Sequence, residues 1–473
     1  MKITRLIFIG WLLFSSAFSS YTQSYFQQEV NYSIEVTLNA ELKSLMGHIN
    51  IQYKNNSPDT LHKIYMHLWP NAYKNTKTAL AEQLRGNKKA TLEYAKKEFR
   101  GFIDSLDFKV NDRSVNWSLD KKHIDIGLIS LNEPLFPGQS LKISTPFYVK
   151  IPDARISRLG TYKESFMITQ WYPKPAVYDL NGWHPMPYLD QGEFYSEFGN
   201  FDVNITLPYD YVVAATGELQ TESEKEFIEK RIEETEKYLA DAAANPISKD
   251  KSTEYKIVRF TQNKVHDFAW FASRQFLIQK SAVTLPNGGN TVETFAFFTP
   301  QNSKNWNKTG VEAVNKSIEF YSRKVGNYPY RVCTAVDGII SAGGGMEYPT
   351  ITIIGRMGSK SSLEEVIAHE VGHNWFYGML ASNERDYPWM DEGLNSFYDN
   401  WYTREIMHDS GGMLPNLPIF GLKKVTNADN VYLPYLFQKR RGIFQPIGDP
   451  SQKQKAINYG IGVYTMTAFN LKY

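Results

Sequence analysis

The fold is best predicted from the sequence His369-Glu370-Val371-Gly372-His373, which is followed after eighteen further residues by Glu392. Residues four apart on a helix lie on one face, so His369 and His373 can hold one metal ion between them. Glu370 lies further round the helix, near the metal but not on it, where it can act as a general base. Glu392 supplies a third, acidic ligand, and two histidines with one carboxylate are typical of a catalytic zinc site.

Two helices are predicted around this motif. Serines followed by glutamates in residues 361–365 form a capping box, so a helix is expected to begin just before His369. A second helix is expected after Pro388, beginning where Glu392 stands, which can return that carboxylate to the metal. The alternative is that the two histidines are ordinary core residues and Glu392 is a surface carboxylate.

Three further stretches belong with the motif. Gly344-Gly345-Met346-Glu347-Tyr348 lies upstream, Tyr459 and Tyr464 lie downstream, and Thr169-Gln170 opens a strand-rich stretch in the first half of the chain. Together with the HExxH motif and Glu392 they resemble the M1 family of zinc aminopeptidases. This gluzincin group includes aminopeptidase N and leukotriene A4 hydrolase.

The resemblance implies roles for the glycine-rich stretch. Glu347 would bind the free α-ammonium group of a peptide by charge-assisted hydrogen bonds. Gly344 and Gly345, followed by Met346, would let the peptide approach closely and pair with a strand edge. Gln170 would contact the same end of the substrate, the alternative being a hydrogen bond within its own domain.

The resemblance also implies a tyrosine hydroxyl that stabilises the oxyanion. Tyr464 is favoured over Tyr459 because an apolar helix follows it, and the alternative is that both are packed aromatics. Besides its ending, described below, the sequence departs from the family pattern in two motifs. Tyr348 stands where the family has Asn, and neither tyrosine is followed by the family's Lys.

The composition limits the classes of binding partner that can be expected. The net charge is only +2, which gives no electrostatic reason to expect nucleic acid or a membrane surface as a partner. Cys333 is the single cysteine, so an intrachain disulfide is excluded. The expected partners are one Zn²⁺ per chain and peptides with a free N-terminus.

The N-terminus is typical of a secretory signal. Lys2 and Arg5 precede a short apolar run over residues 6–14, and small residues follow it. Residues 1–22 are therefore expected to be a signal peptide, the alternative being an uncleaved anchor. The mature protein is expected to be periplasmic or secreted, from a bacterial source, with no stable membrane span.

The expected fold class is multi-domain α+β. Residues 23–293 alternate with the period of two of half-buried strands, which predicts an antiparallel β-domain, a saddle or sandwich, with helical inserts near 78–99 and 222–244. Residues 294–473 are expected to form a thermolysin-like catalytic domain. The chain ends at Tyr473 inside a helical pattern, so this domain is expected to be truncated and the family's C-terminal helical domain missing.

The predicted function is a zinc-dependent aminopeptidase with Glu370 as the general base. Three alternatives stay open: an endopeptidase, an epoxide hydrolase with the same zinc site, and a non-catalytic peptide-binding relative. The retained ligands and Glu370 argue against the last of these.

Overall fold

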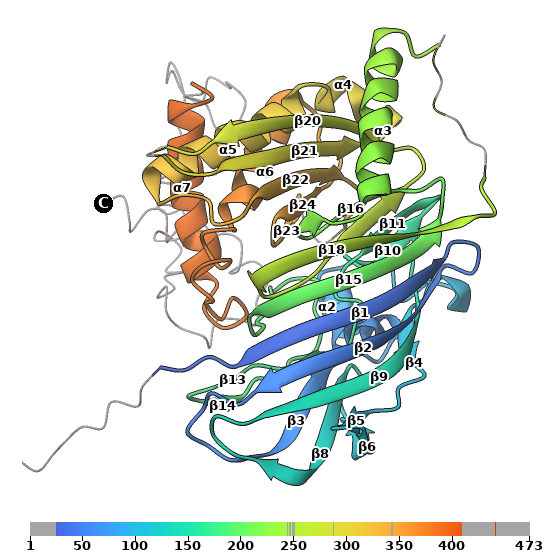
Figure 1. The fold of residues 1–473 in the computed structure, drawn as a ribbon, viewed down its shortest axis with the longest axis vertical. Helices are drawn as coiled ribbons and strands as arrows, with labels where there is room; N and C mark the ends of the chain where they lie inside the picture. The colour runs from blue at the N-terminus through green and yellow to red at the C-terminus, as the bar shows by residue number, and fades with distance from the viewer. Residues whose placement is uncertain are drawn as a thin grey trace, which may run out of the picture.

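The computed structural model describes residues 25–243, 245, 247, 251–286, 288–341, 344–408 and 440. In these residues a β-rich N-terminal domain is followed by a smaller lobe that contains a mixed sheet and helices (Figure 1). The expected signal peptide, Tyr459, Tyr464 and the end of the chain lie outside the described residues.

A large twisted sheet dominates the N-terminal domain. Its strand order is β17-β18-β15-β1-β2-β9-β5-β6, with β4 also paired to β9, and all pairs are antiparallel except β1 with β15. Buried and exposed residues alternate along its long strands, as a half-buried strand requires. The strands are β1 (Glu29–Asn39), β2 (Ser44–Lys54), β4 (Phe102–Asp104), β5 (Lys109–Val110), β6 (Arg113–Ser114), β9 (Ser140–Lys150), β15 (Gly199–Pro208), β17 (Glu218–Leu219) and β18 (Tyr255–Val265).

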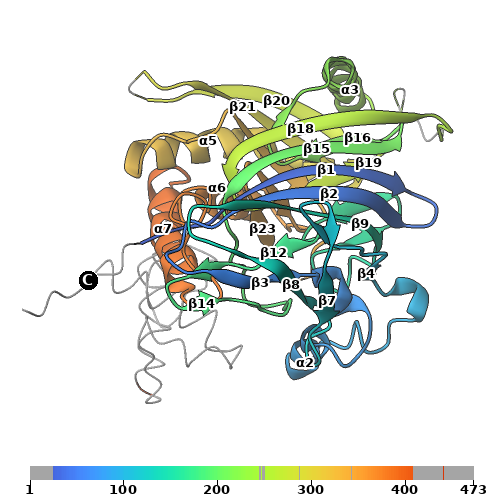
Figure 2. The same cartoon turned by 60° about the horizontal axis from the view of Figure 1, so that its bottom comes forward.

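Smaller sheets pack against the large one, and Figure 2 shows β3 and β8 lying beneath it. One has the order β12-β3-β8-β7, another β10-β11-β19-β16, and β13 pairs with β14. Trp171 and Trp270 are fully buried, and Trp171 contacts both Phe147 of the large sheet and Trp270 of a smaller one. The strands are β3 (Leu61–His67), β7 (Asn116–Leu119), β8 (Ile126–Leu135), β10 (Gly160–Tyr162), β11 (Ser165–Ile168), β12 (Lys174–Pro175), β13 (Tyr178–Asp179), β14 (Gly182–Trp183), β16 (Val212–Ala215) and β19 (Trp270–Ser273).

The second lobe is built on a five-stranded sheet of order β20-β21-β22-β24-β23. Its strands are β20 (Leu277–Thr284), β21 (Thr291–Phe298), β22 (Val332–Asp337), β23 (Gly345–Tyr348) and β24 (Ile351–Ile354). The central three strands are parallel, and the edge strands β20 and β23 are antiparallel to their neighbours. Because the β20–β21 hairpin pairs with β22, this sheet begins before residue 294, where the sequence placed the start of the catalytic domain.

The helices of this lobe are η3 (Pro300–Asn302), α4 (Ser303–Trp306), α5 (Thr309–Lys324), α6 (Lys360–Gly372), the π-helical turn η4 (Trp389–Gly393) and α7 (Leu394–Glu405). The N-cap of α6 is Ser359, whose hydroxyl accepts from the amide of Ser362 at 3.1 Å. The helix therefore begins before the serines that the sequence pattern suggested as caps, because Ser359 is the residue in extended conformation.

Both expected inserts contain helix. The first has α2 (Ala79–Gly86), capped by Thr78, and η2 (Lys97–Phe99), and it follows η1 (Trp69–Tyr73). The second is α3 (Glu222–Ala240), which lies against both main sheets (Figure 1). Its Glu224 forms a buried ion pair with Lys256 of β18 at 2.7 Å, and Thr235 accepts from the amide of Ile278 of β20 at 2.9 Å.

The predicted α+β class, with a β-rich domain ahead of a thermolysin-like lobe, is confirmed. Among the described residues, no helix combines the length and the apolar composition that a membrane crossing needs.

A buried histidine predicts how stability depends on pH. His266 is 6% exposed and packs against Phe198 and Tyr377, and burial is the main cause that lowers its pKa to about 3. Because the folded pKa lies below the unfolded value of about 6.5, stability is full above pH 6.5 and falls as the pH drops. We expect this one group to remove about 2 kcal/mol of unfolding free energy between pH 7.5 and pH 5.

Urea unfolding of the parent and of His266→Phe at both pH values measures this contribution. The variant should lose about 2 kcal/mol less than the parent on acidification, since every other titrating group is shared. Equal losses in the two proteins would contradict the assignment of His266 as a histidine that stays neutral when folded.

Candidate active site

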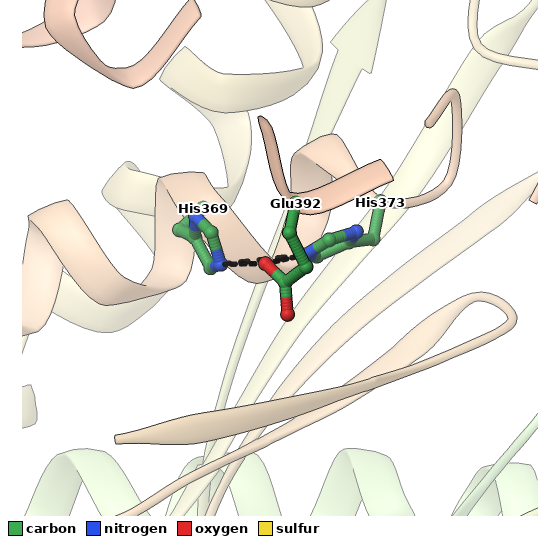
Figure 3. A group of neighbouring side chains, drawn as sticks. All are labelled: His369, His373 and Glu392. Carbon is green, nitrogen blue, oxygen red and sulfur yellow. Dashed lines mark hydrogen bonds and ion pairs between the residues drawn. The ribbon is translucent and has the colours of Figure 1, made fainter. Parts of the chain in front are cut away.

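Three side chains predicted to bind metal meet at one point. His369 and His373 come from the end of α6, and Glu392 comes from the π-helical turn η4 (Figure 3). Oε2 of Glu392 lies 3.3 Å from Nε2 of His369 and 3.4 Å from Nε2 of His373, and the two Nε2 atoms are 3.3 Å apart.

These separations fit a tetrahedral metal ion. Zinc bonds to nitrogen and oxygen ligands are about 2.0–2.2 Å long, which places ligand atoms on a tetrahedron about 3.3–3.6 Å apart. The two imidazoles and one carboxylate also match the ligands that zinc prefers in catalytic sites. The residues therefore fit zinc in both their chemistry and their spacing, and they are one ligand short of a full tetrahedral set.

Close packing of α6 brings the ligands together. A side chain at Gly372 would collide with Oδ1 of Asn395 on α7 and with the hydroxyl of Tyr321 on α5. Glycine between the two ligand histidines thus lets three helices approach one another. The π-helical turn, in which the amide of Gly393 bonds back to the carbonyl of Pro388 at 3.4 Å, precedes α7 and carries Glu392.

A second layer of residues orients His369. Its Nδ1 lies 2.6 Å from Oδ2 of Asp399, which leaves Nε2 as the ring atom that faces Glu392 and His373 and can bind a metal. The side chain of Asn395 donates to the carbonyl of His369 at 2.7 Å. The hydroxyl of Tyr321 is within hydrogen-bond reach of both Asn395 (3.0 Å) and Asp399 (3.2 Å).

Sequence reasoning missed Asp399, although a signal was available. Asp399 follows Glu392 by seven residues, or two helical turns, so the two carboxylates share a helix face. His373 is oriented differently, because its Nδ1 donates to the backbone carbonyl of Phe376 at 3.2 Å.

The ligand cluster is strongly coupled electrostatically. Burial opposes the charged form of His373, but Glu347 and Glu392 outweigh it and raise its pKa to about 10. Likewise, burial opposes ionisation of Glu392, yet His373 and His369 hold its pKa below the usual range. In His369 the carboxylates of Asp399 and Glu392 overcome burial and raise the pKa. The site therefore favours positive charge opposite its carboxylates.

Glu370 faces the same space as the ligands. It is 5% exposed, and its buried Oε2 has no hydrogen-bond partner among the described residues. Burial raises the pKa of its carboxyl well above the usual range, and Glu347 adds to the effect while His369 and His373 oppose it. A side chain at Gly345 would run into the Glu370 carboxylate, so this glycine makes room for it.

The predicted exopeptidase residue lies next to Glu370. One donor atom each from Glu347, Glu370 and His373 lies within 4.8 Å of the other two. Glu347 sits on the edge strand β23, is 9% exposed, and has an unpartnered buried Oε1 in the described part of the chain. The structure thus brings together three candidate metal ligands, a carboxylate beside them and a second carboxylate on the edge strand β23.

The remaining predicted residues lie around this group. Gly344 is exposed next to β23, and a side chain there would meet only ordinary contacts. Met346 is buried on β23. Gln170 is also buried, and its side chain hydrogen-bonds to the hydroxyl of Tyr348.

Three more acidic residues beside the site were not predicted. Glu193 pairs with Arg158 through both carboxylate oxygens, at 3.0 and 2.8 Å, and burial raises its pKa to about 7 against the opposing effect of Arg158. Glu384 and Asp391 lie beside His373, with donor atoms within 4.8 Å, and burial raises the pKa of both carboxyls. Glu193 and Glu384 carry no periodic pattern in the sequence, so only the fold reveals them.

Comparisons with known proteins identify the fold. No protein-family model and no curated protein sequence matches this chain. The crystal structure of the M1 zinc metallopeptidase from Deinococcus radiodurans has a TM-score of 0.57 at 13% identity, covering 94% of this chain and 82% of that one. A two-domain M1 zinc metallopeptidase mutant bound to L-arginine gives 0.59, and a Deinococcus radiodurans mutant bound to a Tyr-Ser-Ala substrate gives 0.56, with the same identity and coverage. The described chain therefore has the fold of the M1 zinc metallopeptidases.

The Asp399–His369 contact predicts a measurable change in metal affinity. Asp399→Asn keeps the size of the side chain but weakens its hold on the imidazole, and should lower the affinity for Zn²⁺ by about 10- to 100-fold. His373→Ala, which removes a ligand atom, should lose more. Competition with a chelator on the full chain measures both constants.

Asp202→Asn is a matched control, because Asp202 also pairs with a cation, Arg259, but this pair is partly exposed and lies on strands β15 and β18 of the β-domain. It should leave zinc affinity unchanged. Equal zinc affinity in the parent, Asp399→Asn and His373→Ala would reject this ligand assignment.

Proposed function

We propose that this protein is a zinc-dependent aminopeptidase, which removes N-terminal residues from peptides. The observation that carries this proposal is the placement of Glu347. Among the described residues, the buried carboxylate of Glu347 has an oxygen without a hydrogen-bond partner, and ligand atoms of Glu347, of the base Glu370 and of the ligand His373 lie within 4.8 Å of one another.

The residues can be given distinct tasks. His369, His373 and Glu392 would hold the ion, which would polarise the scissile carbonyl as a Lewis acid and lower the pKa of a bound water. Glu370 accepts the proton of the attacking water and returns it to the leaving amine. Tyr464 or Tyr459 would stabilise the oxyanion, as the family resemblance implies.

The sheet edge fits an extended substrate. Among the described residues β23 pairs with β24 alone, so a peptide could pair with the backbone groups of its other edge. Glu347 would end this track by binding the α-ammonium group, which limits cleavage to the first residue. The binding of single amino acids and of a tripeptide by structurally similar M1 enzymes supports this class of substrate.

We also propose that the protein is exported to the periplasm or beyond. The support is the sequence of residues 1–22, with its basic start and short apolar run. Fractionation of a native host, with mass determination of the N-terminus, tests this proposal, and recovery of the protein with Met1 intact in the cytoplasmic fraction alone would refute it.

Glu370→Gln tests the base. The amide keeps the size of the side chain but cannot accept a proton, so kcat should fall by at least about 100-fold while zinc content and thermal stability stay near the parent's. A fluorogenic amino-acid amide gives the rate, and metal analysis of the same sample gives the zinc content. Near-parental turnover in the folded, zinc-loaded variant would assign the base elsewhere.

Glu347→Gln tests the exopeptidase assignment. Loss of the ammonium partner should lower kcat/KM for peptides with a free N-terminus by about 10- to 100-fold, in keeping with a lost charge-assisted hydrogen bond. N-acetylated peptides should be poor substrates of both proteins. If the parent cleaves free and acetylated peptides equally well, the protein is an endopeptidase.

A further inference from the structure

The edge strand β23 has two faces with different neighbours. Successive side chains on a strand point to opposite sides. Gly345 and Glu347 face helix α6, where Gly345 borders the Glu370 carboxylate and Glu347 lies near His373. Met346 and Tyr348 face the other way, toward the N-terminal β-domain.

Three contacts join this second face to the β-domain. Nε of Arg158 donates to Sδ of Met346 at 3.1 Å. The side-chain amide of Gln170 donates to the hydroxyl of Tyr348 at 3.0 Å, and that hydroxyl donates back to Oε1 of Gln170 at 3.1 Å.

The third contact lies at the turn after β23. The backbone amide of Gly217 donates to Oγ1 of Thr350 at 2.8 Å. The contacts therefore fall on every second residue, from Met346 through Tyr348 to Thr350, and all three of these residues are buried.

The β-domain partners are themselves held in place. Arg158 donates to both carboxylate oxygens of Glu193 and to the carbonyl of Leu189. Gln170 has a left-handed backbone, with φ of 46°, a conformation that persists in a non-glycine residue only when the surroundings determine it. The charge-assisted hydrogen bonds of Arg158 and the fixed backbone of Gln170 together make a rigid support.

Both the nitrogen and the oxygen of the Gln170 side-chain amide are engaged in hydrogen bonds. Its nitrogen and its oxygen each share a hydrogen bond with Tyr348, and it is 3% exposed. Turning the amide toward a substrate would leave the Tyr348 hydroxyl buried without these partners. Its contacts point to action through Tyr348.

We propose that Gln170 and Arg158 are positioning residues. They contact the face of β23 that points away from the metal ligands and so fix the position of Glu347 on the opposite face. The inference rests on the proposed aminopeptidase function for its consequence, but not for the support itself. It also explains Tyr348, since a residue as short as Asn at this position would not carry a phenolic hydroxyl to Gln170.

A double-mutant cycle tests the proposal. Tyr348→Phe removes only the hydroxyl, Gln170→Met keeps the length of the side chain, and the third protein carries both changes. All are made in the zinc-loaded full chain with Glu370→Gln, and calorimetry measures the Kd of the tripeptide Tyr-Ser-Ala and of its N-acetylated form. Each single change should raise the Kd of the free tripeptide about fivefold, the size of one lost hydrogen bond, and the double change should raise it no further.

Two results would overturn the positioning role. If Gln170→Met weakens binding while Tyr348→Phe does not, or if the two effects multiply, Gln170 acts on the substrate directly. If neither change affects the free tripeptide, the contact does not position Glu347.

Tyr330→Phe is the matched control. Tyr330 is also buried in the second lobe and also donates across to the β-domain, to the carbonyl of Lys264 at 3.3 Å, but it does not lie on β23. It should leave the Kd unchanged, and thermal melts should show comparable stability in all variants.

Hydrogen exchange of the β23 amides separates this inference from the proposed function. Tyr348→Phe and Gln170→Met should each speed exchange of residues 345–348 by about tenfold, and Tyr330→Phe should not. A parent that neither binds nor cleaves peptides would refute the aminopeptidase proposal, while unchanged exchange in both variants would refute the support by the β-domain.

Discussion

The structure depends on bringing three ligand atoms from two separate segments to within 3.4 Å of one another. Two histidines from one helix meet this condition through their spacing alone, but Glu392 must arrive from a different segment at the correct height. Gly372 allows the close approach of α5, α6 and α7. Tyr321, Asn395 and Asp399 then lock this packing, because each buried polar group needs a partner.

The second lobe does not provide the whole site by itself. β23 is an edge strand, and an edge strand has pairing on one side only, so its position is less fixed than that of a central strand. In the described part of the chain no strand pairs with the other edge of β23, while the face that carries Met346 and Tyr348 contacts the N-terminal domain. Under the proposed support, an extended ligand could pair with the other edge of β23 while contacts from the N-terminal domain, to residues 178 and 188 positions away in sequence, keep Glu347 in place.

The sequence predicted the features that depend on local spacing. His369, His373 and Glu392 could be chosen together because helical periodicity links the first two and a predicted helix start supplies the third. Asp399 could have been found by the same rule. The contacts of Gln170 with Tyr348 and of Arg158 with Met346 join residues 178 and 188 positions apart, and no local pattern encodes such pairs. The sequence also placed most of the β20–β21 hairpin in the first domain, although its strands belong to the sheet of the second lobe. Long-range strand pairing decides which sheet a hairpin joins, and composition does not show it.

The distribution of charge explains why this site should bind cations. Four carboxylates lie around the two ligand histidines: those of Glu347, Glu370, Glu392 and Asp399. The nearby cation Arg158 is paired with Glu193. Gathering carboxylates in a buried space is unfavourable without opposite charge, because burial and mutual repulsion both disfavour their ionised forms. A divalent metal and a substrate ammonium would supply that charge. Glu347 and Glu370 each have a buried oxygen without a hydrogen-bond partner among the described residues, and such oxygens favour a positively charged ligand over a neutral one.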